Sequence, residues 1–227
     1  MNVLRYAFLL LIGIPLARVF TGADVIGRRH LPRKGPAIIA ANHNSHVDTL
    51  LLMTIFPLPS MGRLRPVAAA DYFLRGPLIG WFSRNMIGIV PIDRRGGGEH
   101  GDVLAPARQA LANGDIIIIF PEGSRGDATD ALGRLKAGVA HLSEAFPEAP
   151  VIPVWLEGAG RVLPKGTRVP VPMNCTVLVG EPLAWCGHRG TFIERLRMAL
   201  TALKDAAPPQ HWIEDDGETP SVIRSSS

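Results

Sequence analysis

Cysteine and aromatic residues are scarce in this chain of 227 residues, and each shortage excludes a class of protein. The only cysteines, Cys175 and Cys186, belong to no CxxC or Cys/His metal spacing. A disulfide framework is therefore not expected, and a reducing compartment fits better. Aromatic residues make up 6% of the chain, and they do not alternate with basic residues as a base-stacking surface requires. The composition therefore argues against nucleic acid as a partner.

Acidic residues are nearly absent from the first part of the chain. Before Asp48 there are six basic residues and one acidic residue, Asp24, although the whole chain has a net charge of only +4. A basic segment next to apolar residues is typical of a protein that meets an anionic membrane surface. We therefore expect membrane lipids among its partners.

The chain also lacks an apolar run of membrane-spanning length. Residues 6–17, between Arg5 and Arg18, form an apolar run of twelve that Pro15 interrupts. As a helix this run would measure about 18 Å, against about 30 Å for the hydrocarbon core of a bilayer. We expect it to lie in, or dip into, one leaflet. A buried core helix and a signal peptide remain possible as well.

From Ala37 onwards, apolar runs of strand length alternate with helical patterns. Such alternation, with strands apolar throughout, predicts an α/β fold: a single domain with a largely parallel sheet flanked by helices, plus the N-terminal membrane-associating helix. The expected strands are 37–41, 66–70, 88–92, 115–120, 151–155 and 176–179, and the expected helices are 49–56, 103–113, 135–146 and 191–206. We divide the chain into a membrane-associating segment 1–28, a main domain 29–206 and a disordered tail 207–227.

His43 follows the first expected strand, and Asp48 lies five positions later. A neutral histidine can accept a proton from an alcohol, and a carboxylate can orient its ring, as in acyl-transfer triads. Asp48 also fits a second interpretation, because Ser45 to Asp48 matches a capping box at a helix start. His46 is a rival base that we expect to be structural. No further histidine or cysteine cluster completes a metal site, so no metal is expected.

A second cluster, Glu122-Gly123-Ser124-Arg125, follows the most apolar expected strand. Arg125 suits bidentate binding of a phosphate, and Gly123 allows close approach of the backbone. Glu122 would either hydrogen-bond an acceptor hydroxyl or position an arginine. A charged surface turn is the competing interpretation. Because the carboxyl ends of parallel strands share one edge, His43, Asp93-Arg94 and this cluster are expected to converge there.

Four blocks in this order resemble the glycerophospholipid acyltransferase family, whose best-known bacterial type is 1-acyl-glycerol-3-phosphate acyltransferase. The blocks are Asn42-His43 with Asp48 (the HX4D motif), residues 88–94, residues 120–125 and residues 151–154. Lys136 and Gly138 also resemble a helix start that often follows the third block. The resemblance implies an O-acyltransferase of phospholipid biosynthesis, working without a cofactor on the cytoplasmic face of the cell membrane. His43 resembles the general base and Asp48 its partner, while Arg94, Glu122, Gly123, Ser124 and Arg125 resemble acceptor-binding residues.

The implied reaction moves a fatty acyl group from acyl-CoA or acyl carrier protein to the hydroxyl of a lysophospholipid, with lysophosphatidic acid as the first choice. One departure concerns residues 67–73, where many relatives have a lysine and this chain has alanines. Another lysolipid, such as lyso-ornithine lipid, therefore stays open as the acceptor. Two further hypotheses compete with acyl transfer: a thioesterase or lipid hydrolase that uses the same base, and a lipid-binding protein without activity.

Overall fold

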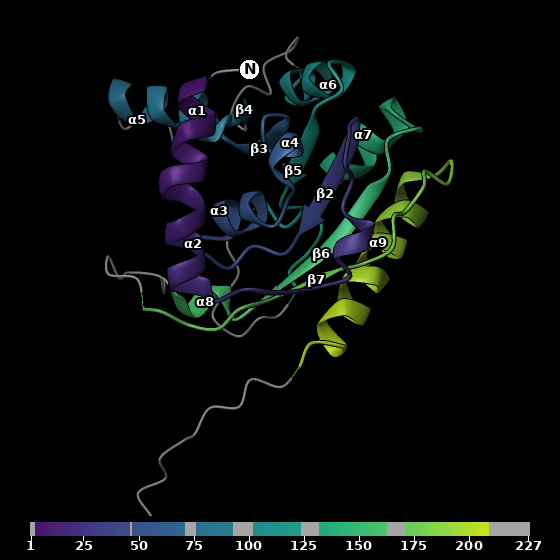
Figure 1. Ribbon diagram of the computed structural model, residues 1–227. Coiled ribbons are helices and arrows are strands. Elements are labelled where there is room, and N and C mark those ends of the chain that lie inside the picture. The colour runs from purple at the N-terminus through teal and green to yellow at the C-terminus, as the bar shows by residue number, and fades with distance from the viewer. Residues whose placement is uncertain are drawn as a thin grey trace, which may run out of the picture.

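The computed structural model describes residues 3–45, 47–70, 76–92, 102–123, 132–162 and 171–208. Within these ranges the chain forms a seven-stranded sheet in the order β1-β7-β6-β2-β5-β3-β4, flanked by helices (Figure 1). Neighbouring strands are parallel, except that β6 and β7 are antiparallel. The strands are β1 (Asp24–Ile26), β2 (Ala37–Ala41), β3 (Leu64–Ala69), β4 (Val90–Ile92), β5 (Ile116–Ile119), β6 (Val151–Glu157) and β7 (Thr176–Val179).

The largely parallel sheet predicted from the sequence is confirmed, with two additions. β1 pairs with β7, so the sheet begins inside the segment 1–28 that the sequence analysis separates from the main domain. Short helices that no periodicity indicated also lie between the expected elements. The helices are α1 (Val3–Phe8), α2 (Ile14–Thr21), α3 (Val47–Thr54), α4 (Leu58–Met61), α5 (Pro77–Phe82), α6 (Ala105–Ala112), α7 (Gly138–Ala145), α8 (Ala159–Val162) and α9 (Arg189–Asp205), with π-helical stretches at Leu9–Gly13 and Ser83–Ile87.

The four consecutive isoleucines of β5 show why its sequence has no alternation. Ile116 and Ile118 pack into the core on one face of the sheet, whereas Ile117 and Ile119 pack into the core on the other. All four are buried, with at most 7% of their surface exposed. A central parallel strand that is covered on both sides must be apolar at every position.

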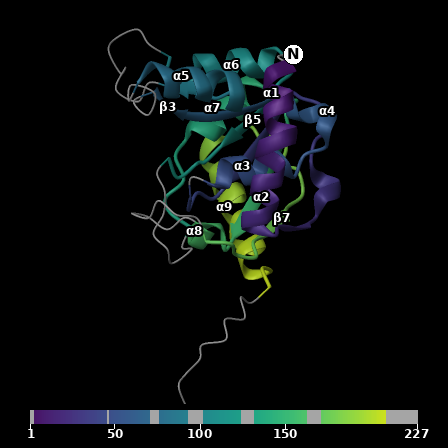
Figure 2. The same cartoon turned by 60° about the vertical axis from the view of Figure 1, so that its left-hand side comes forward.

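Helices cover both faces of the sheet. The core of one face contains residues of α2, α3 and α8, and the core of the other contains residues of α6, α7 and α9. Figures 1 and 2 show the N-terminal helix and α9 on opposite sides of the sheet. The molecule is therefore a three-layer α/β structure whose N-terminal helix belongs to one outer layer.

The N-terminal helix is longer than the apolar run predicted. Helical structure continues from Val3 to Thr21, 19 residues, which is long and apolar enough to cross a membrane by length and composition. The expectation that Pro15 interrupts the helix was wrong. A π-helical stretch, Leu9–Gly13, comes directly before the turn that contains Pro15. Such a local widening of the helix accommodates the missing N–H of a proline.

Arg5 fastens this helix to the rest of the domain. Its guanidinium donates hydrogen bonds to the backbone carbonyls of Gly62 at 3.0 Å, Leu64 at 2.7 Å and Ile87 at 2.9 Å. Burial, followed by the positive charge of Arg65, lowers the pKa of Arg5 to about 10. The side chain is only 6% exposed, so one face of the helix is held on the protein and not in solvent.

The opposite face of the N-terminal helix is apolar and exposed. Leu11 is 73% exposed and Val19 is 68% exposed. The ring of Phe8 packs edge-on against that of Phe82 in α5, with 5.1 Å between the centroids. The exposed apolar side chains of the two elements are Val3, Leu4, Leu10, Leu11, Ile12, Leu16, Val19, Leu78, Ile79, Trp81 and Phe82. We call this set the exposed apolar face.

Candidate active site

The ends of β2 and β5 carry the two clusters that the sequence singled out. The strands are parallel neighbours, and their register pairs Ala40 with Ile119. The residues that follow each strand therefore leave the sheet at the same edge. β3 is parallel both to β5 and to β4, so β4, which ends at Ile92, also ends at this edge. The topology thus gathers the carboxyl ends of three strands on one side, where open α/β sheets bind ligands.

His43 and Asp48 are in contact. His43 Nδ1 lies 2.9 Å from Asp48 Oδ2, and the side chains are 19% and 0% exposed, respectively. A carboxylate only accepts hydrogen bonds, so Nδ1 carries the proton and Nε2 of the neutral ring is left as the acceptor. The ring also reaches the surface, as a group that is to take a proton from a bound molecule must.

Asp48 has a second task at the start of α3. The same oxygen accepts the backbone N–H groups of Asn44 and Ser45, both at 2.7 Å. Ser45 Oγ in turn accepts the N–H of Val47 at 3.3 Å. These bonds form a capping-box-like arrangement in which the carboxylate reaches back to the residues before the helix. The two interpretations of Asp48 therefore hold together, because one oxygen both caps the helix and holds the histidine.

Two further contacts fix the position of His43. The side chain of Asn42 accepts the N–H of Leu156 at 2.7 Å and donates to its carbonyl at 3.0 Å, which ties the end of β2 to β6. The ring of Phe120, directly after β5, stacks on the imidazole with 4.1 Å between the centroids. Asn42 thus anchors the backbone just before His43, and the ring of Phe120 packs on the imidazole itself.

Glu122 is buried beside the histidine, with 7% of its surface exposed. Its Oε1 accepts the N–H of Gly133 at 3.0 Å, whereas Oε2 has no hydrogen-bond partner within the described ranges. Burial raises the pKa of Glu122, and the backbone N–H groups of Gly133 and His43 oppose that rise. The carboxyl group therefore joins the turn after β5 to the segment before α7, and it keeps one oxygen for another partner.

Gly123 allows Lys136 to lie across this turn. The glycine has a φ of +72°, and a Cβ atom built there would lie 2.6 Å from Lys136 Nζ. The backbone N–H of Lys136 also donates to the carbonyl of Pro121 at 2.8 Å. A side chain at position 123 would thus strain the backbone and displace an ammonium group from the candidate site.

Several predicted residues cannot be placed in this way. Arg94, Ser124 and Arg125, together with His46, lie outside the described residues. The fourth block, residues 151–154, forms the start of β6, and Val151, Ile152 and Val154 are 0% exposed. This block is therefore core strand. The contact of Phe120 with His43 escaped sequence reasoning, because an apolar residue at a strand end gives no signal of it.

The chain has an α/β fold, and a hydrogen-bonded histidine–carboxylate pair lies at the carboxyl edge of its sheet. The family model described as Acyltransferase matches residues 22–157, and the chain belongs to that family. The chain is 30% identical over 150 residues to a chloroplastic 1-acyl-sn-glycerol-3-phosphate acyltransferase, BAT2, of Brassica napus. The match covers 66% of this chain and 41% of the relative. The chain is 28% identical over 163 residues to 1-acyl-sn-glycerol-3-phosphate acyltransferase alpha of Homo sapiens, covering 70% and 54%.

Among solved structures, the fold is similar to the crystal structure of the 1-acyl-sn-glycerophosphate acyltransferase PlsC from Thermotoga maritima. The TM-score is 0.73 at 19% sequence identity, and the match covers 91% of this chain and 81% of the other. At this identity the likeness concerns the fold. This chain spans about half, or less, of the length of the two curated relatives named above.

Proposed function

We propose that this chain transfers a fatty acyl group from a thioester of coenzyme A or acyl carrier protein to the free hydroxyl of 1-acyl-glycerol-3-phosphate, which gives phosphatidic acid. The observation that carries the proposal is the contact between His43 and the fully buried Asp48 at the carboxyl edge of the sheet. Family membership and the names of the curated relatives support the choice of reaction and acceptor.

The reaction begins at Nε2 of His43. This nitrogen takes the proton of the acceptor hydroxyl while the oxygen forms a bond to the thioester carbonyl carbon. Asp48 stays ionised and stabilises the imidazolium that results. The tetrahedral intermediate then loses the thiolate, which takes the proton back from Nε2. The thioester is already activated, so the proposed reaction uses no metal and no further cofactor.

Acceptor binding is assigned by the family resemblance. We propose that Arg94 and Arg125 bind the phosphate of the acceptor, because a guanidinium pairs with phosphate through two parallel hydrogen bonds. Ser124 would lie beside it, and Gly123 would let the backbone approach closely. Glu122 supplies a buried oxygen, Oε2, that can accept a hydrogen bond from the acceptor. Two of these residues lie in the described ranges: Glu122 is beside His43, and Gly123 packs against Lys136.

The acceptor is a membrane lipid, and the exposed apolar face offers a way to reach it. We propose that this face rests in one leaflet on the cytoplasmic side of the membrane, where acyl thioesters are found. The docking of Arg5 supports a helix that lies on the membrane surface, since three protein carbonyls hold its start against the domain. Exposed Leu, Trp and Phe side chains beside basic residues suit such interfacial binding.

Flotation with vesicles of anionic phospholipid tests this placement. A variant with Leu11→Glu and Val19→Glu should remain at the bottom of the gradient, whereas the parent protein should float. The matched control is Glu at an exposed polar position of α9, for example Arg195→Glu, which should float. Equal flotation of all three proteins would reject the exposed apolar face as the contact.

The activity itself is tested with one acyl-CoA and a panel of lysolipids, with the products identified by mass spectrometry. We expect phosphatidic acid from 1-acyl-glycerol-3-phosphate as the main product, and its amount should depend on the acceptor. Release of free fatty acid at the same rate with and without acceptor would instead identify a hydrolase. Preference for lyso-ornithine lipid would keep the transfer chemistry and replace the acceptor.

A further inference from the structure

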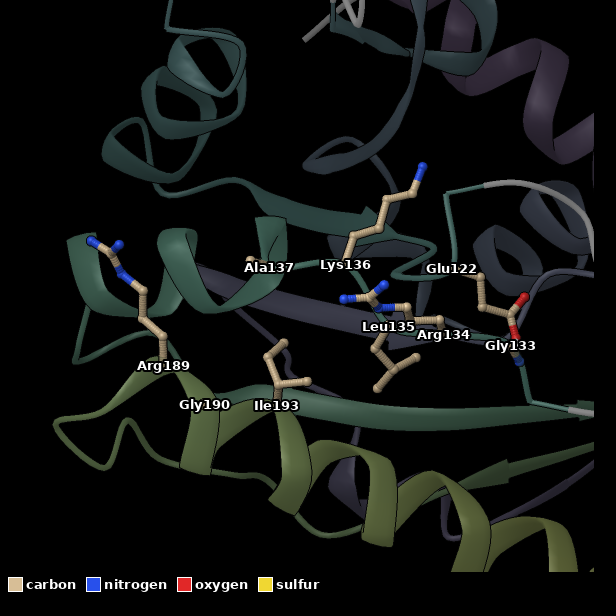
Figure 3. A pocket seen from close by; sticks show the side chains of 9 residues that line it. All are labelled: Glu122, Gly133, Arg134, Leu135, Lys136, Ala137, Arg189, Gly190 and Ile193. Carbon is tan, nitrogen blue, oxygen red and sulfur yellow. Dashed lines mark hydrogen bonds between the residues drawn. The ribbon is translucent and has the colours of Figure 1, made fainter.

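A groove lies between residues 133–137, just before α7, and the start of α9, on the face of the sheet opposite the N-terminal helix. It has a volume of about 670 Å³, within the range of roughly 300–1,000 Å³ typical of small-molecule sites. Figure 3 shows Glu122 and Arg189 at its opposite ends, with Arg134 between them and Leu135 and Ile193 along its wall. One end thus opens beside the buried carboxyl group next to His43.

The two ends of the groove lie near opposite ends of α7. At one end, the N–H of Gly133 meets Glu122, just before the helix begins. At the other end, Nε of Arg189 meets Oε2 of Glu144, in the last turn of the helix, at 2.7 Å. Eight residues of helix measure about 12 Å at about 1.5 Å per residue. The contact of Arg189 with Glu144 is therefore separated from the start of α7, the end nearer the candidate active site, by roughly the length of that helix.

The charge of the groove is mainly positive. Arg134 and Lys136 have no ion-pair partner among the residues that the structure describes, and Arg189 shares its charge with Glu144. That last pair is half exposed, at 49% and 42%, so Arg189 keeps donors for a second partner. The α7 N-terminus, which has no side-chain cap, adds the positive end of its dipole. The groove therefore suits an elongated anion.

We propose that this groove binds the pantetheine arm and phosphates of the acyl donor, with Arg134 and Arg189 as the phosphate-binding residues. The inference rests on the proposed acyltransferase function and adds the donor site to it. The thioester of such a donor is separated from its phosphates by a long arm, which matches a groove that starts beside the histidine and ends at a distant arginine.

The same geometry excludes the acceptor. In 1-acyl-glycerol-3-phosphate the reacting hydroxyl and the phosphate are on neighbouring carbons, so a phosphate at Arg189 would leave the hydroxyl far from His43. The two helical layers, on opposite faces of the sheet, agree with this division. The exposed apolar face lies on the side of the N-terminal helix, whereas the groove, between residues 133–137 and the start of α9, lies on the other side. The lipid would then arrive from the membrane and the water-soluble donor from solvent.

The double variant Arg134→Ala with Arg189→Ala tests the site, and Arg195→Ala, an exposed arginine of α9 outside the groove, is the matched control. Three palmitoyl thioesters serve as donors: that of coenzyme A, that of carrier protein, and that of pantetheine, which has no phosphate. Of the two phosphate-bearing donors, the one that the parent protein uses with the higher kcat/KM is compared. Its KM should rise by about tenfold or more in the double variant, because charge-assisted hydrogen bonds to phosphate are lost. The KM for the acceptor and the rates with the pantetheine thioester should stay within about twofold.

Binding of coenzyme A alone, measured by calorimetry, separates this proposal from the proposed function. If the parent protein binds coenzyme A and the double variant binds it about tenfold more weakly, the site is supported even when no lysolipid is acylated. If acyl transfer proceeds and the double variant matches Arg195→Ala in both KM and coenzyme A binding, the site is wrong and the function stands. A rise in the acceptor KM, or an equal loss with the pantetheine thioester, would also overturn the donor assignment. A melting curve confirms that each variant is folded.

Discussion

Replacing Asp48 by asparagine isolates the charge of the carboxylate from its shape. Oδ2 of Asp48 accepts three hydrogen bonds, from His43 Nδ1 and from the N–H groups of Asn44 and Ser45. The oxygen of an asparagine can occupy the same place and accept the same three bonds. Its NH₂ group would then take the place of Oδ1, which has no partner within the described ranges. The ring of His43 should therefore keep its position and its proton on Nδ1.

The variant loses the attraction between the carboxylate and the imidazolium formed during proton transfer. For unit charges about 4 Å apart, this attraction is about 4 kcal/mol at an effective dielectric constant of about 20. At about 1.36 kcal/mol per tenfold change in rate, kcat should fall by roughly a thousandfold. The KM for the lysolipid should change little, because the charge acts in the transition state and not on the bound acceptor.

The assay is acyl transfer to 1-acyl-glycerol-3-phosphate under saturating donor, with Asp48→Ala as a comparison. Alanine removes the acceptor for two backbone N–H groups, and each unsatisfied buried group costs about 1–3 kcal/mol. Asp48→Ala should therefore melt at a lower temperature, while Asp48→Asn should melt close to the parent protein. A kcat for folded Asp48→Asn within about fivefold of the parent would refute the role given to the charge.

Three further changes follow from the same contacts. Burial raises the pKa of Glu122 above its ordinary value of 4.5, so the folded protein holds this proton more tightly than the unfolded chain. The parent protein should accordingly lose stability relative to Glu122→Gln as the pH rises above 4.5, and a difference in Tm that is the same at acidic and at neutral pH would contradict this. Gly123→Ala should lower the free energy of unfolding by about 1–2 kcal/mol because of its positive φ, and it should reduce activity because it moves Lys136. Gly187→Ala is the control: Gly187 has a φ of +83° and open space around it, so this variant should keep its activity. Arg5→Met should lower the free energy of unfolding by about 2 kcal/mol, or roughly 4–8 °C in Tm, and should expose the N-terminal helix to limited proteolysis; unaltered cleavage would mean that Arg5 does not hold the helix.

The centre of the sheet could be predicted because β2 and β5 are apolar at every position. The run 37–41 lies between Pro36 and Asn42, and its predicted length is the observed one. The strand predicted over 115–120 is observed over 116–119, one residue shorter at each end. β1 was missed because Asp24–Ile26 is short and only partly buried, and only its pairing with β7 makes it a strand. The direction of β7 depends on tertiary packing that no local pattern specifies. The N-terminal helix was predicted too short, because the apolar run was bounded by Arg5 and Arg18, whereas the helix continues through both. The π-helical stretch that accommodates Pro15 gives no signal in the sequence.

The candidate site was predicted in part for a similar reason. The spacing of His43 and Asp48 is local, and five residues suffice for a carboxylate in the first turn of a helix to reach back to the residues before it. The stacking of Phe120 on His43 joins two strand ends that are distant in sequence. It follows from the parallel register of β2 and β5, which fixes which strand ends meet and cannot be derived from either segment alone. The bond from Gly133 to Glu122 depends instead on how the chain folds back after β5.

The central claim is that Nε2 of His43 accepts the proton of the lysolipid hydroxyl, and His43→Ala tests it most directly. With purified protein, radiolabelled acyl-CoA and 1-acyl-glycerol-3-phosphate, the parent should form labelled phosphatidic acid. The folded variant should form it about 10²–10⁴ times more slowly, the usual range for loss of a general base. Transfer at a near-normal rate by His43→Ala would show that another group accepts the proton, and the account of this site would be wrong.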